Sequence, residues 1–305
     1  MGISGLLPLL KPATKKKHIS EYRGQRLAID GYAWLHRAAH SCCVQLTTGV
    51  PTTRWITYIL ELVDMLLEHQ IIPLIVFDGD ELPAKKATEE QRAAGRATNL
   101  KAGREALAKN DHANARIYLA KAVEITPRMA AELIQVLKDE RPTVEYVVAP
   151  YEADAQLSFL CRSGQVDGVI AEDSDTIPYG CKDVLFKLQR DGMCEGITLS
   201  DIHTIPIPGF DLQTFDEDMM IALCVGAGCD YFDGVHGFGI KNSHKFISKH
   251  RTVHRMLRAM KLTGTTHPIN TIHILNLTLT FPIYPINTIH ILNLTLTCFT
   301  LPYRT

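Results

Sequence analysis

The sequence predicts an α/β fold in which a mostly parallel central sheet carries helices on both faces. Short apolar runs alternate along the chain with longer stretches of helical periodicity. Such strand–helix alternation gives a parallel sheet with helices packed on both sides. The run at 71–77, IIPLIVF, is apolar throughout, as is typical of a strand that is buried on both faces.

The elements follow from local patterns, taken in chain order. Five short apolar runs are expected to form strands, at 25–30, 71–77, 144–148, 166–171 and 184–188. Four stretches with helical periodicity are expected to form helices, at 32–46, 54–69, 152–161 and 215–225. Residues 84–139 are long, charged and helix-prone, and Pro127 after Thr126 marks a break or a new helix start.

The end of the chain differs in composition from the rest. Residues 262–303 contain no Asp, Glu, Lys or Arg, and PINTIHILNLTLT occurs at 268–280 and again at 285–297. Solenoid folds need units of about 20 residues and at least three copies. We therefore expect one domain over residues 1–262, with 263–305 outside the working fold.

Composition argues against several classes of protein. Eight cysteines occur without CxxC spacing, which favours reduced thiols inside a cell over disulfides or a zinc site. Neither a secretory signal nor an apolar run of about 20 residues is found, so no membrane partner is expected. The GxxxxGK[ST] and GxSxG motifs are absent, which argues against a P-loop NTPase and a serine hydrolase. The run Lys15–Lys17 could be a nuclear address, although such a run is more typical of a solvated turn.

Charge is unevenly distributed. The net charge is -1, but residues 85–128 carry ten Lys and Arg against five Asp and Glu. A basic element that faces an acidic one suits a phosphate backbone held near bound metal.

Seven carboxylates share one setting, at or just beyond the end of a strand-like run or at the start of a helix: Asp30, Asp78, Glu152, Asp154, Asp173, Asp175 and Asp230. The carboxyl ends of strands in an open α/β sheet share one crevice, and acids gathered there repel one another unless cations lie among them. Mg²⁺ prefers oxygen ligands, and two such ions about 4 Å apart can promote phosphodiester cleavage. Any single acid could instead cap a helix, but the shared setting favours metal.

Basic and aromatic residues form further candidates. Lys85, Arg92 and Arg96 fall on one helix face, where they could bind the scissile phosphate or form ordinary ion pairs. Tyr32 could stack on a terminal base and His36 could contact a phosphate, although such residues commonly serve packing.

A glycine-rich turn precedes a helix near the end of the expected domain. Gly234, Gly237 and Gly239 occur before that helix, with Lys241 and Lys245 beside them. Its backbone N–H groups could bind a phosphate, although a glycine turn alone is a weak signal.

Six segments together resemble the structure-specific 5′ nuclease superfamily, which includes flap endonuclease and exonuclease 1. They occur in family order over about residues 1–250: MGISGLLPLL, AIDGYAWLH, VFDGDELPAKK, VAPYEADAQLSFL, EDSDTIPYGCKDVLFKL and GCDYFDGVHGFGIKNS. The fourth and fifth look closer to the exonuclease 1 branch. The resemblance implies two Mg²⁺ ions, or Mn²⁺, bound by the seven acids. It also implies a helical arch over about 84–128 whose Lys85 and Arg92 act at the scissile phosphate.

The resemblance further assigns DNA contacts. Gly2, Tyr32, His36 and Arg96 would lie at the substrate. A helix–two-turn–helix over about 228–250, with Gly237, Gly239 and Lys241, would hold duplex DNA and a potassium ion. This sequence departs from the family pattern at Ala227, at Asp233–Gly234, and in the AAG between Arg92 and Arg96.

The implied function is a nuclear, metal-dependent 5′→3′ exonuclease on double-stranded DNA with 5′ flap endonuclease activity, in mismatch repair and recombination. Its substrates would be DNA with 5′ ends, nicks or flaps. Mismatch-repair partners are implied by the family, but the long tail that binds them is expected to be absent here. Three alternatives stay open: a dedicated flap endonuclease, a DNA-binding remnant that no longer cuts, and a small-molecule phosphatase.

Overall fold

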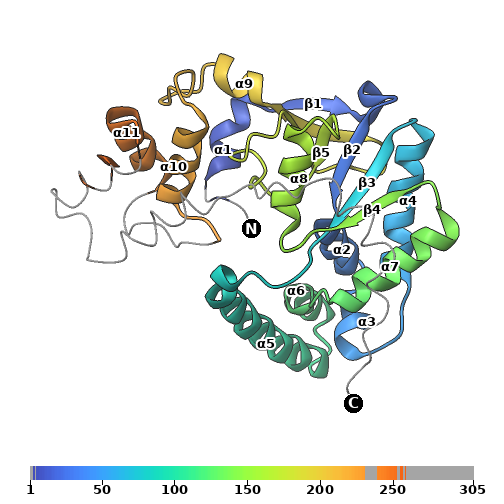
Figure 1. Ribbon diagram of the computed structural model, residues 1–305. Coiled ribbons are helices and arrows are strands. Elements are labelled where there is room, and N and C mark those ends of the chain that lie inside the picture. The colour runs from blue at the N-terminus through green and yellow to red at the C-terminus, as the bar shows by residue number, and fades with distance from the viewer. Residues whose placement is uncertain (1–2, 4, 231–238, 253–254, 257, 259–305) are drawn as a thin grey trace.

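The computed structural model describes residues 3, 5–230, 239–252, 255–256 and 258. A seven-stranded sheet with the order β1-β7-β6-β5-β2-β3-β4 lies at its centre (Figure 1). The pairs β4–β3, β3–β2, β2–β5 and β5–β6 are parallel, whereas β7 is antiparallel to both β6 and β1. The predicted mostly parallel sheet is confirmed, and the predicted tail at 263–305 lies outside the described residues.

The strands are β1 (Lys15–His18), β2 (Arg26–Asp30), β3 (Ile72–Phe77), β4 (Glu145–Val148), β5 (Gly168–Ile170), β6 (Asp183–Phe186) and β7 (Met193–Thr198). The helices are α1 (Leu6–Leu10), α2 (Gly31–His40), α3 (Cys43–Thr48), α4 (Arg54–Glu68), α5 (Lys86–Ala108), α6 (His112–Ala122), α7 (Pro127–Glu140), α8 (Ala153–Arg162), α9 (Leu199–Thr204), α10 (Glu217–Ala227) and α11 (Ile240–His250). Short 3₁₀ turns flank α1, β2 and α5.

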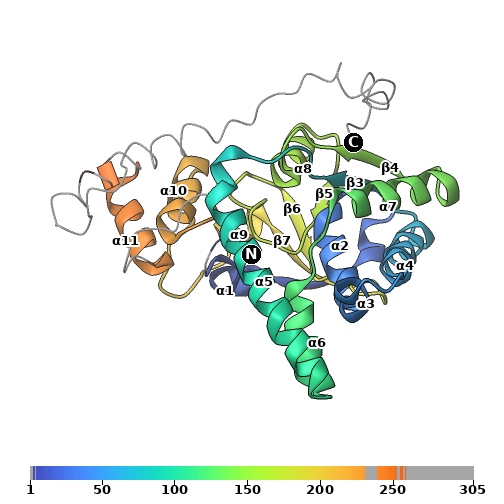
Figure 2. The same cartoon turned by 90° about the horizontal axis from the view of Figure 1, so that it is seen from below.

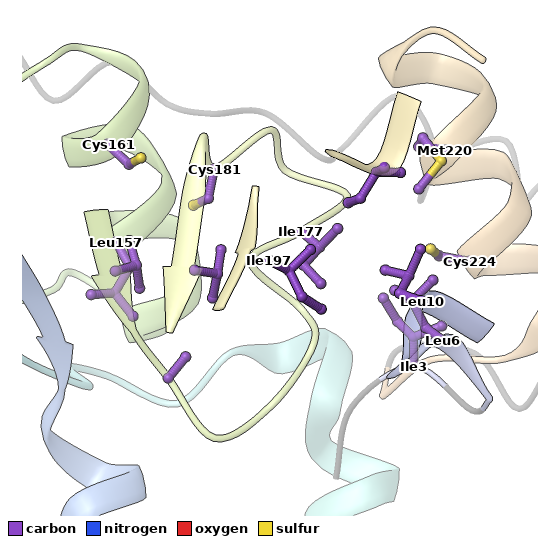
Figure 3. Packing of buried hydrophobic residues seen from close by; sticks show 14 of the residues in the cluster. Ile3, Leu6, Leu10, Leu157, Cys161, Ile177, Cys181, Ile197, Met220 and Cys224 are labelled. Carbon is purple, nitrogen blue, oxygen red and sulfur yellow. The ribbon is translucent and has the colours of Figure 1, made fainter. Parts of the chain in front are cut away.

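Two hydrophobic cores lie on opposite faces of the sheet. Side chains alternate along a strand, so Ala28 of β2 joins one core while Leu27 and Ile29 join the other. Helices α1, α8, α9 and α10 supply the first core, part of which Figure 3 shows. Helices α2, α4 and α7 supply the second. Each face of the sheet is therefore covered by helices, as the sequence predicts.

The expectation of one helix over 32–46 is wrong, because the chain breaks after His40. The Ser41 hydroxyl donates to the Ala38 carbonyl oxygen at 2.7 Å, and the Ser41 N–H donates to the same oxygen at 3.0 Å. This tight turn ends α2. Cys42 then packs in the core under α2 and α4, and Cys43 packs in a separate cluster with Val123. The break therefore lets the adjacent Cys42 and Cys43 pack into two different hydrophobic clusters.

The expectation of a solvated turn at Lys15–Lys17 is also wrong, because these residues form the edge strand β1. Lys15 Nζ lies 2.7 Å from Asp201 Oδ1, and Lys17 Nζ lies 3.1 Å from Asp183 Oδ2. A charged edge strand resists pairing with other chains. None of the helices in the described part of the chain is both long and apolar enough to span a bilayer.

Helices α5 and α6 form a hairpin that projects from the sheet (Figure 2). We call residues 86–122 the helical hairpin. The two helices pack tightly at Gly103, where an added Cβ would lie 2.5 Å from Leu119 Cδ2. At Gly95 on the same helix, no atom of the described residues beyond the adjoining helix backbone lies within 4 Å of such a Cβ.

The two glycines predict opposite effects of one substitution. Gly103→Ala should destabilise the protein by about 1–3 kcal/mol, because the methyl group overpacks against Leu119. Gly95→Ala should stabilise it by about 0.5–1 kcal/mol, because alanine is the better helix former. Urea unfolding of both variants measures these changes, and equal effects would contradict the described helix contact.

Candidate active site

The carboxyl ends of β2 and β3 deliver the first two acids to one edge of the sheet. Asp30 is the last residue of β2, and its Oδ1 accepts the Ala33 N–H at 2.9 Å, which caps α2. Asp78 follows β3, and its Oδ1 accepts the Ala153 N–H at 2.6 Å. Asp78 therefore ties the end of β3 to the start of α8. Glu152 and Asp154 lie at that helix start.

The remaining acids come from later segments. Asp173 and Asp175 lie in the loop after β5, where Asp175 Oδ1 accepts the N–H of Ile3 at 3.1 Å. Asp230 lies just beyond α10. Five segments that are distant in sequence thus supply acids to one place.

Burial and mutual repulsion raise the pKa values of the acids at the centre of the site. Burial raises the pKa of Asp30 to about 7. The N–H of Ala33 opposes this rise, while the charges of Asp78 and Asp173 add to it. Buried like charges favour the protonated form in this way.

The other acids extend the same network. Burial raises the pKa of Asp154 well above its usual value, and the charges of Asp30 and Asp175 add to the rise. Burial raises the pKa of Asp175 to about 6, with further contributions from Asp230 and Asp173. Burial also raises the pKa of Asp78, with a contribution from Glu152. The seven acids form one electrostatic cluster, which we call the acid cluster.

Two basic residues lie against the acid cluster, Lys85 in the turn before the helical hairpin and Arg92 in its first helix. Lys85 Nζ lies 2.6 Å from Glu152 Oε1 and 3.6 Å from Asp230 Oδ2. Burial lowers the pKa of Lys85, but Glu152 and Asp230 outweigh it, so the net shift is upward. Arg92 donates to Asp230 Oδ2 at 2.6 Å and to Glu89 Oε1 at 2.5 Å. Its buried Nε has no hydrogen-bond partner among the described residues.

The donor set suits a hard divalent cation. The acid cluster offers only carboxylate oxygens, the ligands that Mg²⁺ and Mn²⁺ prefer. Within the described residues, no three His, Cys, Asp or Glu side chains are grouped tightly enough to hold an ion. Glu152 and Asp230 face Lys85 and Arg92, while Asp30 and Asp78 each accept a backbone N–H.

The expected DNA contacts are spread around the acid cluster. Tyr32 is half-buried, with its ring edge-on to Phe77 at a centroid distance of 6.5 Å, whereas His36 is exposed on α2. Arg96 donates to Glu124 Oε1 at 3.1 Å, so in the described structure it joins an ion pair. Gly239 precedes α11 at its N-cap position. Gly2 and Gly237 lie outside the described residues, as does most of the glycine turn.

The structure adds residues that the motifs did not single out. Lys249 and His244 line a groove on α11 together with the expected Lys241 and Lys245. The i, i+4, i+8 spacing of the lysines could have revealed Lys249. Thr88 donates its hydroxyl to the backbone oxygen of Asp230 at 2.8 Å. No sequence pattern points to that contact, because its partners lie on different parts of the fold.

Two family domains match the chain around this site. The XPG N-terminal domain matches residues 1–99, and the XPG I-region matches residues 143–230. The chain belongs to the XPG family. The matched ranges contain all seven acids of the acid cluster, together with Lys85 and Arg92.

Known XPG relatives agree with this assignment. Exonuclease 1 of Arabidopsis thaliana is 40% identical over 268 residues, which cover 88% of this chain and 36% of the relative. The chain thus spans about a third of the length of that relative. The catalytic core of Rad2 in complex with DNA substrate superimposes with a TM-score of 0.60 at 21% identity, covering 90% of this chain and 79% of that one. Flap endonuclease-1 of Methanococcus jannaschii superimposes with a TM-score of 0.56 at 22% identity, covering 87% and 81%. These structures show that the XPG fold is shared.

Proposed function

We propose that this chain is a metal-dependent 5′→3′ exonuclease on double-stranded DNA, with 5′ flap endonuclease activity, that serves mismatch repair and recombination in the nucleus. Its substrates would be duplexes with 5′ ends, nicks or flaps. One observation carries the proposal: seven carboxylates from five segments form one cluster, with Lys85 and Arg92 directly against it. Such an arrangement suits phosphodiester hydrolysis. The 40% identity to an exonuclease 1 supports the exonuclease reading.

The acids and the basic residues would have different roles in cleavage. The acid cluster would hold two Mg²⁺ ions, or Mn²⁺, which when bound would activate the attacking water and offset charge on the leaving 3′ oxygen. Lys85 and Arg92 would place positive charge beside the scissile phosphate, where charge builds up in the transition state. Both already lie within ion-pair distance of acids in the cluster.

Other residues would position the DNA. Tyr32 would stack on a terminal base, and His36 and Arg96 would contact phosphates near the cut, with Gly2 beside them. The lysines of α11 form a basic row that would follow the backbone of the duplex. Gly237, Gly239 and a potassium ion at the helix–two-turn–helix would complete that contact.

An acid removed from the cluster tests the proposal. Asp173→Ala should lower the rate of digestion of a 5′-recessed duplex by at least about 10³-fold, because charge stabilisation by metal is worth several kcal/mol. Asp139→Ala on α7 is the matched control, because Asp139 is an exposed acid that contacts Gln135. The rates are read on gels of end-labelled DNA with and without Mg²⁺. Wild-type digestion by Asp173→Ala would refute the proposal.

The same gels separate the proposed activity from its alternatives. A displaced 5′ flap that is cut while recessed and blunt ends remain intact would identify a dedicated flap endonuclease. Salt-dependent DNA binding without Mg²⁺-dependent product would instead identify a binding protein that does not cut.

A further inference from the structure

Asp230 is held at two separate points by the helical hairpin and the turn that precedes it. Its carboxylate accepts from Arg92 at 2.6 Å and lies 3.6 Å from Lys85 Nζ. Its backbone oxygen accepts from the Thr88 hydroxyl at 2.8 Å. These three partners come from residues 85–92, the 3₁₀ turn and first turns of α5.

The two points of attachment differ in kind. Arg92 and Lys85 both contact Oδ2 of the carboxylate, so a cation bound at Oδ2 would compete with both of them. The contact with Thr88 uses the backbone oxygen, which is not a charged ligand and can keep its partner. Among the described hydrogen bonds between α5 and Asp230, the one from Thr88 does not use the carboxylate, so a cation bound at Oδ2 leaves it intact.

We infer that Thr88 is a positioning residue, which keeps α5 attached to Asp230 when the carboxylate of Asp230 changes partner. The attachment fixes the start of the helical hairpin beside the acid cluster. Lys85 and Arg92 then stay within reach of a bound phosphate after their ion pairs with the acids have opened. This inference rests on the proposed function for its catalytic consequence, but the attachment itself can be measured without DNA.

Hydrogen exchange of the segment 83–92 measures the attachment directly. Thr88→Val replaces the hydroxyl with a methyl group of similar size, and a net hydrogen bond contributes about 0.5–1.5 kcal/mol. In Mg²⁺ we expect exchange to be about 2- to 10-fold faster in Thr88→Val than in wild type. In EDTA the ion pairs of Lys85 and Arg92 still hold the segment, so we expect a change below about twofold. Thr88→Ser keeps the hydroxyl and should exchange as wild type does.

Thr98 supplies a matched control on the same helix. Its hydroxyl donates to the Ala94 oxygen at 3.0 Å, a contact within α5 that does not reach the acid cluster. Thr98→Val should leave exchange of 83–92 unchanged. If Thr88→Val exchanged no faster in Mg²⁺ than Thr98→Val, the inference would be overturned. Thr88→Ala provides the same test if the valine variant does not fold.

Activity gives the second readout. Thr88→Val should lower kcat by about 2- to 10-fold and leave the KM for DNA unchanged, with recovery in Thr88→Ser. A wild-type protein that cuts no DNA would refute the proposed function, while the exchange measurement would still decide the role of Thr88. A change in KM alone would overturn the positioning role, because it would place Thr88 at the DNA.

Discussion

Asp30→Asn should abolish cleavage and, in the same protein, raise the stability of the metal-free fold. Burial raises the pKa of Asp30 to about 7, so at pH 8 the folded protein carries this charge at a cost that the unfolded chain does not bear. A neutral amide removes that cost, while its oxygen can still accept the N–H of Ala33. We expect a gain on the order of 2 kcal/mol in the free energy of unfolding, and a loss of at least about 10³-fold in cleavage rate.

The pH dependence of this gain provides its check. A carboxyl whose pKa is raised on folding contributes stability below its unfolded pKa of 3.8, and loses it as the pH rises through about 7. The difference between Asp30→Asn and wild type should therefore be largest near pH 8 and disappear toward pH 4. Urea unfolding in EDTA at several pH values measures it. A variant that is less stable than wild type at pH 8 would contradict the electrostatic account of the acid cluster.

Lys85→Met should lower the stability of the metal-free fold, whereas Asp30→Asn should raise it. The Lys85 ammonium lies within 3.6 Å of two carboxylates and is only 12% exposed. Its removal leaves buried negative charge without a counterion, which typically destabilises by about 3–5 kcal/mol. We expect a loss toward the lower end of that range in EDTA, and a fall of about 10²–10³-fold in kcat.

Added Mg²⁺ separates the charge effect from a packing effect. A divalent cation can replace the missing positive charge, so Mg²⁺ should raise the melting temperature of Lys85→Met more than that of wild type. Lys86→Met is the matched control, because Lys86 is the exposed neighbour of Lys85. Equal Mg²⁺-induced shifts in Lys85→Met and Lys86→Met would contradict this account.

The sequence predicts the parts of the fold that depend on apolar patterning. The runs that became β2 to β6 are strongly apolar, and their order along the chain sets the parallel core of the sheet. Apolar patterning does not predict β1 or β7. The β1 sequence KKKH has no alternating apolar face, and the β7 sequence MCEGIT is interrupted by Glu195 and Gly196. These strands form because they pair with each other and with β6.

Some features of the candidate site can likewise be predicted from the sequence, whereas others cannot. The positions of Asp30, Asp78, Asp173 and Asp175 at or beyond strand ends can be read from the sequence, because strand ends in a parallel sheet meet at one edge. The ion pairs cannot, because Lys85 contacts Glu152 and Asp230, which are 67 and 145 residues further along the chain. Arg96 likewise meets Glu124 only through the turn between α5 and α6. Such contacts depend on how the helices pack, and local sequence patterns do not determine that packing.

The acid cluster draws on segments from Asp30 to Asp230. A nascent chain that has emerged from the ribosome only through β7 has no Asp230, and Lys85 and Arg92 then lack one of their partners. The complete centre cannot assemble until α10 has been synthesised and has docked on the sheet. During translation, therefore, an incomplete chain lacks the full set of groups proposed for cutting DNA.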